Sequence, residues 1–216
     1  IIHHPGNLTR TLPGQLDREY IQSAKYLHMS HPFEAECAAI RMAKAGGTKI
    51  SYDADYYLPE TWALIPEIDI LVASEYFYRT VFDDSRYEEN CGKIQKMGPE
   101  IVVFTLGGKG CVGADQNGYF EEPTFDVPVE DTVGAGDVFH GAFLFGLLSG
   151  WDTRRCARFA NAVSSIKCTR IGGRAAIPDF KTVMGFMETG VIDYEEIDRR
   201  VAFYHRGLES ALQAEG

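Results

Sequence analysis

The residues whose types and spacing best suit chemistry lie in the segment Asp131–Leu144. There, the small residues Gly134, Ala135 and Gly136 come directly before Asp137, and a long apolar run follows. A helix that begins here would present unpaired amide N–H groups and a partial positive charge, and small residues would let an anion reach those donors. A carboxylate beside them can take a proton from a hydroxyl that attacks a phosphate. The segment therefore predicts a phosphate site with Asp137 as general base and the amides of Gly134, Ala135 and Gly136 as donors to the anion.

A structural role for the same residues is the alternative interpretation. Glycine tolerates the backbone conformations of tight turns, and an aspartate in the first turn of a helix is often only a cap. Short glycine motifs also occur without any function. The four residues Gly134–Asp137 alone do not separate the two interpretations.

A second glycine cluster follows the apolar run Ile101–Phe104, with the sequence Thr105-Leu106-Gly107-Gly108-Lys109-Gly110. Glycines after a strand let the backbone approach a ligand, and the ammonium group of Lys109 suits a phosphate. A hairpin turn is the alternative, since glycine clusters often serve only as turns. The cluster is not a Walker loop, because the chain has no Gly-x-x-x-x-Gly-Lys-Ser/Thr pattern.

The elements that must position these motifs alternate between short apolar runs and segments of helical periodicity, as expected for βαβ units around a parallel sheet. The predicted strands are Tyr26–Ser30, Lys49–Asp53, Ile68–Ala73 and Ile101–Leu106. The predicted helices between them are Phe33–Ala45, Pro59–Ile65 and Tyr87–Met97. Because such crossovers are right-handed, ligands are expected at the carboxyl ends of the strands.

The pattern changes after Leu106 to short alternating strands, which predict an antiparallel flap on the sheet edge. The strands expected there are Cys111–Asp115, Gly118–Glu122 and Thr124–Val127, with a turn at Gln116–Gly118. The helices expected next are Ala135–Ser149, Thr153–Thr169, Phe180–Met187 and Tyr194–Ala211. The first is apolar on nearly every face and should be a central buried helix, whereas the last should lie on the surface.

Length and charge limit the function classes. One α/β domain over residues 1–216 is expected, because no linker or repeat divides the chain. The net charge of −10 argues against a general partner such as nucleic acid or an anionic membrane. No apolar stretch reaches the ~20 residues of a membrane span. The first residues, Ile1–His4, resemble the middle or end of a buried strand.

The cysteines and histidines bear on location and on metal binding. The five cysteines are widely spaced without a Cys-x-x-Cys pair, which favours reduced thiols in a cytoplasmic protein. The pair His28 and His31 lacks the further ligands that a zinc site requires. His28 is expected at a strand end, and His140 is expected to pack within its helix.

The two glycine motifs resemble those of one family. Asp131–Ala142 is similar at every fixed position to the second signature of the ribokinase (PfkB) family of carbohydrate kinases, Asp-Thr-x-Gly-Ala-Gly-Asp-x-x-x-Gly-Ala. In the same order, Thr105–Gly110 resembles the family's Thr-Leu-Gly-x-x-Gly segment, which lines the ATP site. The resemblance implies nucleotide contacts from residues of this segment, namely Thr105, Gly107, Gly108, Lys109 and Gly110.

The resemblance continues through Phe159–Ala162 and Cys168–Gly173, which look like the family's segment over the adenine and beside a monovalent cation. It implies that Asn161 lies by the nucleotide base. It also implies a potassium ion surrounded by Asp131 and by main-chain carbonyls near other positions, namely Val133, Lys167, Arg170 and Gly172.

One segment departs from the family pattern. Where the family has Asn-x-x-Glu, whose Glu organises magnesium, this chain reads Ser74-Glu75-Tyr76-Phe77. Glu75 is one candidate to replace that carboxylate, and Asp53 and Asp55 holding Mg²⁺ through water are another, because Mg²⁺ needs few direct carboxylates. An ordinary first-turn residue is the alternative for Glu75.

The resemblance implies a three-layer ribokinase-like α/β fold with a mainly parallel central sheet, helices on both faces and an antiparallel edge flap. It implies an ATP- and Mg²⁺-dependent phosphotransferase acting on a hydroxyl of a sugar or sugar-like molecule. A nucleoside kinase and a non-catalytic nucleotide- or sugar-binding relative are the alternatives. A dinucleotide oxidoreductase fits poorly, because Gly107–Gly110 lacks the Gly-x-Gly-x-x-Gly form of such enzymes. By the same comparison, the amino-terminal part with its lid is missing; family members often pair through that lid as homodimers.

Overall fold

The structure is a computed structural model that describes residues 9–214. The strand predicted at Ile1–His4 lies outside the described residues. The chain divides into two compact units, Ile1–Val102 and Val103–Gly216. Each unit is described by itself, and the single domain expected over residues 1–216 stays a prediction.

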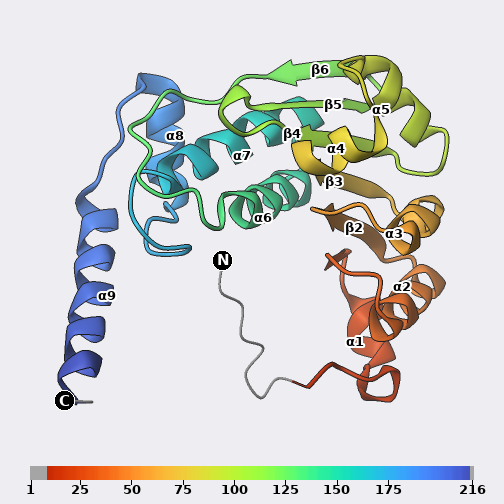
Figure 1. Cartoon of the computed structure of the whole chain (residues 1–216), viewed down its shortest axis with the longest axis horizontal. Helices are drawn as coiled ribbons and strands as arrows, with labels where there is room; N and C mark the ends of the chain where they lie inside the picture. The colour runs from red at the N-terminus through yellow and green to blue at the C-terminus, as the bar shows by residue number, and fades with distance from the viewer. Residues whose placement is uncertain (1–8, 215–216) are drawn as a thin grey trace. The chain divides into compact units, whose positions relative to one another are not determined.

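Three parallel strands form the centre of the first unit: β1 (Tyr26–Met29), β2 (Lys49–Ala54) and β3 (Ile70–Ser74) (Figure 1). β1 pairs with β2 from Tyr26↔Lys49 onward, and β2 pairs with β3 from Ser51↔Ile70 onward. The apolar runs of β2 and β3 are buried, as a parallel sheet covered by helices requires, whereas only Met29 of β1 is buried. The predicted strands are confirmed, with ends that differ by one or two residues.

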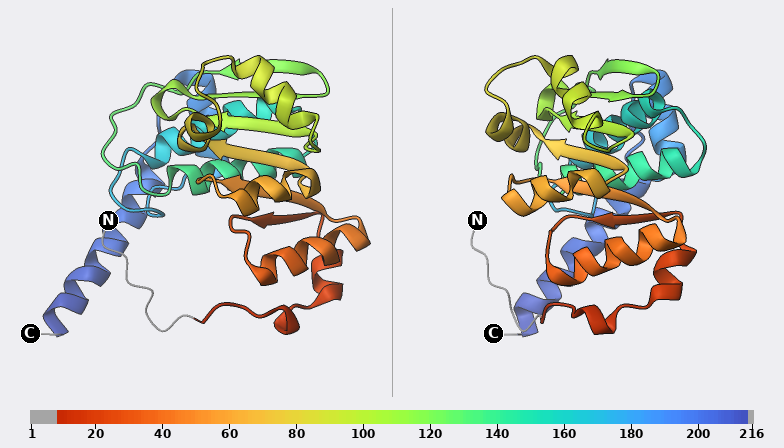
Figure 2. Two further views of the ribbon diagram at one scale, coloured as in Figure 1. Left: turned by 45° about the vertical axis from the view of Figure 1, so that its right-hand side comes forward. Right: turned by 90° about the vertical axis from the view of Figure 1, so that its right-hand side faces the viewer.

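The helices of this unit are α1 (Arg18–Ser23), α2 (Glu34–Gly46), α3 (Pro59–Leu64), α4 (Glu75–Val81) and α5 (Tyr87–Gln95), with 3-10 turns at Pro13–Gln15 and Ile65–Glu67. α2 lies along β1 and β2 (Figure 2). The prediction included α2, α3 and α5 but missed α1 and α4. Both are shorter than two full periods of a hydrophobic pattern, and side-chain caps from Asp17 and Ser74 mark their starts.

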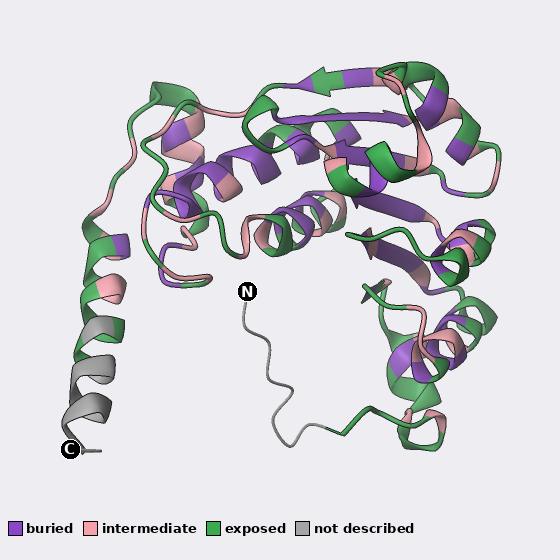
Figure 3. Ribbon diagram, viewed as in Figure 1, coloured by how far each residue is buried: buried purple, intermediate pink, exposed green. Residues whose placement is uncertain are grey.

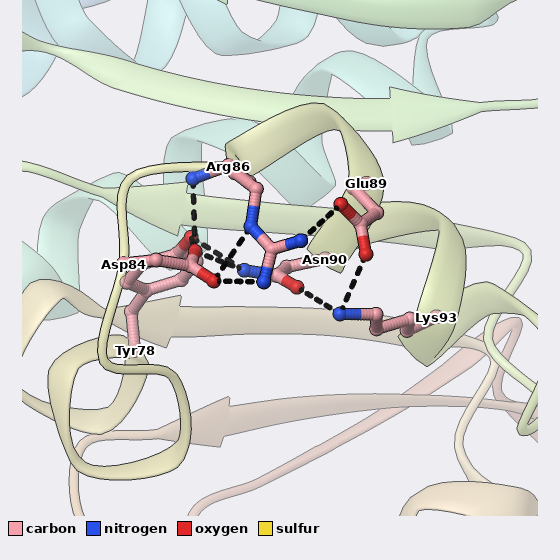
Figure 4. Close-up of polar contacts among 6 residues, drawn as sticks. All are labelled: Tyr78, Asp84, Arg86, Glu89, Asn90 and Lys93. Carbon is pink, nitrogen blue, oxygen red and sulfur yellow. Dashed lines mark hydrogen bonds and ion pairs between the residues drawn. The ribbon is translucent and has the colours of Figure 1, made fainter.

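A polar cluster joins α4 to α5 (Figure 4). The Asp84 carboxylate accepts hydrogen bonds from the Arg86 amide (2.9 Å) and from the Asn90 side chain (2.8 Å). Asn90 is fully buried and also donates to the Tyr78 hydroxyl (2.8 Å). Because buried polar groups need such partners, the cluster fixes the loop between the two helices.

The second unit begins within β4 (Ile101–Thr105) and continues through a 3-10 turn at Gly107–Lys109 into an antiparallel hairpin. The hairpin strands, β5 (Cys111–Asp115) and β6 (Gly118–Glu122), pair from Cys111↔Glu122 to Asp115↔Gly118. Two of the three strands predicted for the flap, and the turn between them, are thus confirmed.

The third strand expected in the flap, Thr124–Val127, is wrong: these residues form no strand. Pro123 and Pro128 bracket the segment, and proline cannot donate to a β ladder. Its polar groups turn to a helix instead, because the Thr124 hydroxyl lies 3.0 Å from that of Ser165.

Four helices follow in the described part of this unit: α6 (Ala135–Leu148), α7 (Thr153–Lys167), α8 (Phe180–Thr189) and α9 (Glu195–Ala214). α6 packs along α7, and α7 also contacts β5 and β6. A Cβ atom at Gly146 of α6 would lie 2.7 Å from the Cys156 sulfur of α7, so the two helices meet closely there. The predicted helices are confirmed within a few residues at their ends.

The expectation of α6 as a central buried helix is wrong. One face is buried, but Phe145 and Leu148 are 44% and 50% exposed. α7 is the more deeply buried helix, as Figure 3 shows. The apolar residues of α6 thus exceed what its packing face can cover. The described part of α9 is mainly exposed, as predicted.

All five cysteines are free, as expected from their spacing. Burial raises the thiol pKa of Cys91, Cys111 and Cys156 to about 12, so these groups stay protonated thiols at neutral pH. Among residues 9–214, no helix combines the length and apolar character needed to cross a bilayer.

Candidate active site

The start of α6 is a tight turn that only glycine suits. Gly134 is the N-cap residue and has a φ of 77°, in the left-handed region. A Cβ atom here would lie 3.0 Å from the carbonyl oxygen of Gly173. The turn therefore brings the 131–134 loop against the 172–173 loop, although the two are about forty residues apart in sequence.

This turn leaves part of the helix terminus open. The Val138 amide donates to the Gly134 carbonyl, and the Ala135 amide donates to the Thr132 carbonyl (3.1 Å). Ala135 was expected among the anion donors, and its engagement within the turn corrects that expectation. Within residues 9–214, the Gly136 and Asp137 amides have no hydrogen-bond acceptor. The Gly134 amide likewise has no acceptor among the described residues, so two of the three predicted donors stay open and the Asp137 amide adds a third.

A pocket of about 220 Å³ lies beside this helix start and unites segments that are distant in sequence. It is lined from four places: the 105–110 loop, the 124–132 segment, the beginning of α6, and one face of α7. Predicted site residues in its lining are Thr105, Gly107, Gly108, Gly110, Ala135, Gly136 and Asn161. Lys109 is exposed and is not among the residues that line it.

The glycine loop approaches the hairpin closely at Gly110. This residue has a φ of 94°, and a Cβ atom there would lie 2.1 Å from the carbonyl oxygen of Glu122. Any side chain would therefore push the loop away from the end of β6. The Gly107–Gly110 cluster is thus a turn, and it also forms one wall of the pocket.

Asn161 is buried in the pocket wall, where it supports the hairpin. Its amide group donates to the carbonyl oxygens of Glu122 (3.0 Å) and Pro123 (3.3 Å). The sequence comparison placed this residue beside a nucleotide base. Its side-chain hydrogens are engaged with the protein itself, so any contact to a base would use the rest of the side chain.

Asp137 has an exposed side chain that lines a second, larger hollow of about 600 Å³. The hollow is mostly apolar, with Phe145, Phe159 and Phe180 in its wall, and Arg174 contributes a charged group. Because Gly136 lines the smaller pocket, α6 begins between the two spaces. A carboxylate and open amides thus share one helix end that solvent and ligands can reach.

The carboxylate of Asp131 is already committed within the protein. One oxygen accepts the Val133 amide (2.8 Å) and the other accepts the Gly172 amide (2.7 Å). These bonds, with a smaller contribution from the charge of Lys167, lower the pKa of Asp131. The predicted proximity of the Asp131 and Gly172 loops is therefore correct, but the carboxylate joins them directly.

Lys167 and Arg170 carry the positive charge in this region. The ammonium group of Lys167 is completely buried and donates to the main-chain carbonyl of Asp131 (2.9 Å). The Arg170 guanidinium pairs with Asp198 (2.7 Å) and lies 4.0 Å from the centre of the Tyr194 ring. A potassium ion at the Asp131 carboxylate would meet the buried ammonium that already bonds the main-chain carbonyl of the same residue. These residues therefore do not fit the cation that the resemblance implies.

Glu75 lies in the first unit, as the first residue of α4. Its carboxylate pairs with Arg79 one turn later (2.6 Å), and the preceding Ser74 caps the helix. The Ser74 hydroxyl also donates to the Asp55 carbonyl (2.9 Å), so the ends of β2 and β3 lie together. The observed contacts of Glu75 are those of a first-turn residue, and its magnesium role stays a prediction.

No role was predicted from the sequence for the side chains of two residues in this region, Ser164 and Lys167. The Ser164 hydroxyl donates to the Ala135 carbonyl (3.0 Å), and Lys167 bonds the Asp131 carbonyl. Their spacing from Asn161, at steps of three along α7, places all three on one face of that helix. This three-residue spacing is the sequence signal from which their common position could have been predicted.

Comparison with known proteins agrees with this geometry. The model of the pfkB family of carbohydrate kinases matches residues 2–179. A 5-dehydro-2-deoxygluconokinase of Shouchella clausii is 30% identical over 197 residues, which cover 82% of this chain and 60% of that protein. The chain thus spans about three fifths of the length of this curated relative.

Solved structures of similar proteins give the same fold. The ribokinase of Thermotoga maritima has a TM-score of 0.71 and 26% identity, covering 82% of this chain and 61% of its own. An E. coli protein solved with ATP and Mg²⁺ has a TM-score of 0.75 and 22% identity, covering 82% and 62%. The fold is therefore the three-layer ribokinase-like α/β arrangement that the sequence predicted.

Proposed function

Because this chain belongs to the pfkB family of carbohydrate kinases, we propose that it transfers the γ-phosphoryl group of ATP to a hydroxyl of a sugar or sugar-like molecule. One observation carries the proposal. The open amides of Gly136 and Asp137 and the exposed Asp137 carboxylate lie at the same helix end, beside a pocket walled by the 105–110 loop. Such an end favours a phosphate and places a base next to it.

In this reaction Asp137 accepts the proton of the attacking hydroxyl. A bond forms between the hydroxyl oxygen and the γ-phosphorus, and the bond from that phosphorus to the bridging oxygen of ADP breaks. The amides of Gly136 and Asp137 donate to the oxygens of the group in transfer, where negative charge is concentrated. Positioned donors of this kind lower the barrier because they need no reorganisation.

The pocket of about 220 Å³ is the proposed nucleotide site. Its glycine-rich wall exposes backbone at Gly107 and Gly108, and apolar groups of Phe125 and Val127 offer a surface for a base. Magnesium, when bound to the phosphates, neutralises their charge and needs few direct protein ligands. The E. coli structural neighbour solved with ATP and Mg²⁺ supports this pair of ligands.

The acceptor is proposed as a sugar, because the chain resembles kinases of sugars and sugar acids. We place the protein in the cytoplasm, since five free thiols suit a reducing compartment. A homodimer stays a prediction from the family resemblance.

The first test replaces the proposed base. Asp137→Asn keeps the side-chain shape but removes the proton acceptor, so turnover should fall by roughly 10²–10⁴-fold while ATP binding persists. ADP release would be measured over a panel of free sugars, sugar acids and nucleosides, and ATP affinity by calorimetry. Asp126→Asn is the matched control, because Asp126 is an exposed carboxylate of the same unit outside both pockets.

Near-normal turnover in Asp137→Asn would refute the base assignment. ATP binding without ADP release on any acceptor of the panel would instead favour a non-catalytic binding protein. If nucleosides are phosphorylated in preference to sugars, the protein is a nucleoside kinase, and the role of Asp137 is unchanged.

A further inference from the structure

We infer that the buried ammonium group of Lys167 takes the place of a monovalent cation beneath the start of α6, so that the site works without potassium. This inference rests on the proposed function, because it concerns the same phosphate site. Its evidence is separate, because it comes from the contacts between the end of α7 and the 130–135 segment.

Lys167 is a charged residue in an unusual place. It lies at the last position of α7, has no solvent exposure, and donates from its ammonium group to the Asp131 carbonyl at 2.9 Å. Lysine is almost never fully buried unless its charge is compensated. A buried charge at the end of a helix also benefits from the helix dipole, which is negative there.

The end of α7 holds the segment that leads into α6 through several bonds. The Cys168 carbonyl accepts the amides of Glu130 (2.8 Å) and Asp131 (3.2 Å). One turn earlier, the Ser164 hydroxyl donates to the Ala135 carbonyl (3.0 Å). Lys167 lies between these contacts in sequence and adds the only charged one among those described. Its ammonium therefore fixes the loop from which the open amides project.

The same group supplies positive charge where a cation would otherwise be needed. The main-chain carbonyl of Asp131 accepts the Lys167 ammonium, and both carboxylate oxygens of Asp131 accept main-chain amides. A second positive ion beside the ammonium would meet like-charge repulsion in a buried place, where screening by water is weak. A covalently attached cation removes both that cost and any dependence on salt composition.

The primary test uses the unmodified protein. Melting temperature and ADP release would be measured in potassium chloride and in tetramethylammonium chloride at equal ionic strength. Both quantities should be the same in the two salts, because an ion that does not bind the folded state cannot stabilise it. A melting temperature that rises with the logarithm of potassium concentration would overturn the inference.

Variants of Lys167 then test whether its ammonium group supplies the positive charge that a bound monovalent cation would otherwise supply. Lys167→Met keeps the length of the side chain without its charge and should lower turnover by about tenfold or more, the equivalent of one charge-assisted hydrogen bond. Lys167→Ala leaves a space, and added ammonium or potassium ions should restore part of its melting temperature. Lys181→Met, an exposed lysine on α8, is the matched control and should respond to neither ion.

The outcomes separate this inference from the proposed function. Absence of kinase activity with a salt-independent melting temperature would refute the function and leave the cation replacement standing. Potassium-dependent melting of the unmodified protein would refute the replacement whatever the activity. Should Lys167→Met fail to fold, the salt comparison on the unmodified protein still decides.

Discussion

Asp131 and Asp137 lie six residues apart in one motif and have different environments. Both oxygens of Asp131 accept main-chain amides, so this carboxylate joins two loops. Asp137 is exposed at the edge of a hollow, next to its own open amide. A proton acceptor must be reachable by its substrate. The environment therefore supports Asp137, and not Asp131, as the proposed base.

Gly134 connects the two loops, and its replacement should show how much the site depends on them. Gly134→Ala would place a side chain at a φ of 77° and 3.0 Å from the Gly173 carbonyl oxygen. A residue with a side chain costs about 1–2 kcal/mol in the left-handed region. We expect unfolding free energy to fall by at least that amount, measured by urea denaturation.

The control for this substitution is Gly185→Ala on α8. There a Cβ atom meets nothing within 4 Å, and alanine is the better helix former by about 0.5–1 kcal/mol. Gly185→Ala should therefore leave stability unchanged or raise it. Equal destabilisation by both substitutions would contradict the account of Gly134.

α7 is the element that organises the second unit. Its buried faces contact α6 and the β5–β6 hairpin, and one of its faces carries Asn161, Ser164 and Lys167 toward neighbouring loops. The helix starts at a side-chain cap, where the Asp152 carboxylate accepts the Arg155 amide (2.9 Å). A correctly started helix is needed to keep that face in register with the loops.

Loss of the cap should weaken the unit. Asp152→Ala leaves the Arg155 amide without its acceptor and should reduce the unfolding free energy by about 0.5–2 kcal/mol. Chemical denaturation monitored by circular dichroism would measure the loss. Asp126→Ala, which removes an exposed aspartate outside any helix, should have little effect; a similar loss in both variants would argue against a capping role.

The whole molecule carries a net charge of −10, and several carboxylates are stabilised in their charged form. The Arg86 amide is the largest cause that lowers the pKa of Asp84, from 3.8 to about 2, with further bonds from the Arg86 and Asn90 side chains. Main-chain amides likewise lower the pKa of Asp131 and Asp179. Such groups bind fewer protons in the folded state than in the unfolded state at mildly acidic pH.

Stability should therefore fall as the solution becomes acidic. The contribution of Asp84 is fully present above its unfolded pKa of 3.8 and is lost as the pH falls toward about 2. Thermal melting across this range would measure the loss. Asp84→Asn should be less stable than the unmodified protein near neutral pH, and the difference should shrink below the unfolded pKa. A constant difference would contradict this role.

The sequence by itself determined the α/β class, the strands and longer helices, and the motif that places Asp137 at the start of a helix. These features are local, because periodicity, glycine and capping residues act over a few positions. The short helices α1 and α4 escaped detection since they carry too few periods. The Thr124–Val127 strand was expected from alternation alone, yet its polar groups bond α7.

Only the tertiary structure decided which donors, carboxylates and charged groups of the site remain available to a ligand. It showed that the Ala135 amide and the Asp131 carboxylate are engaged, that α6 keeps an exposed face, and that the Lys167 ammonium is buried against the Asp131 loop. These facts depend on contacts between residues far apart in the chain. A donor or a charge is available only if no distant group has already used it, and sequence spacing cannot specify that.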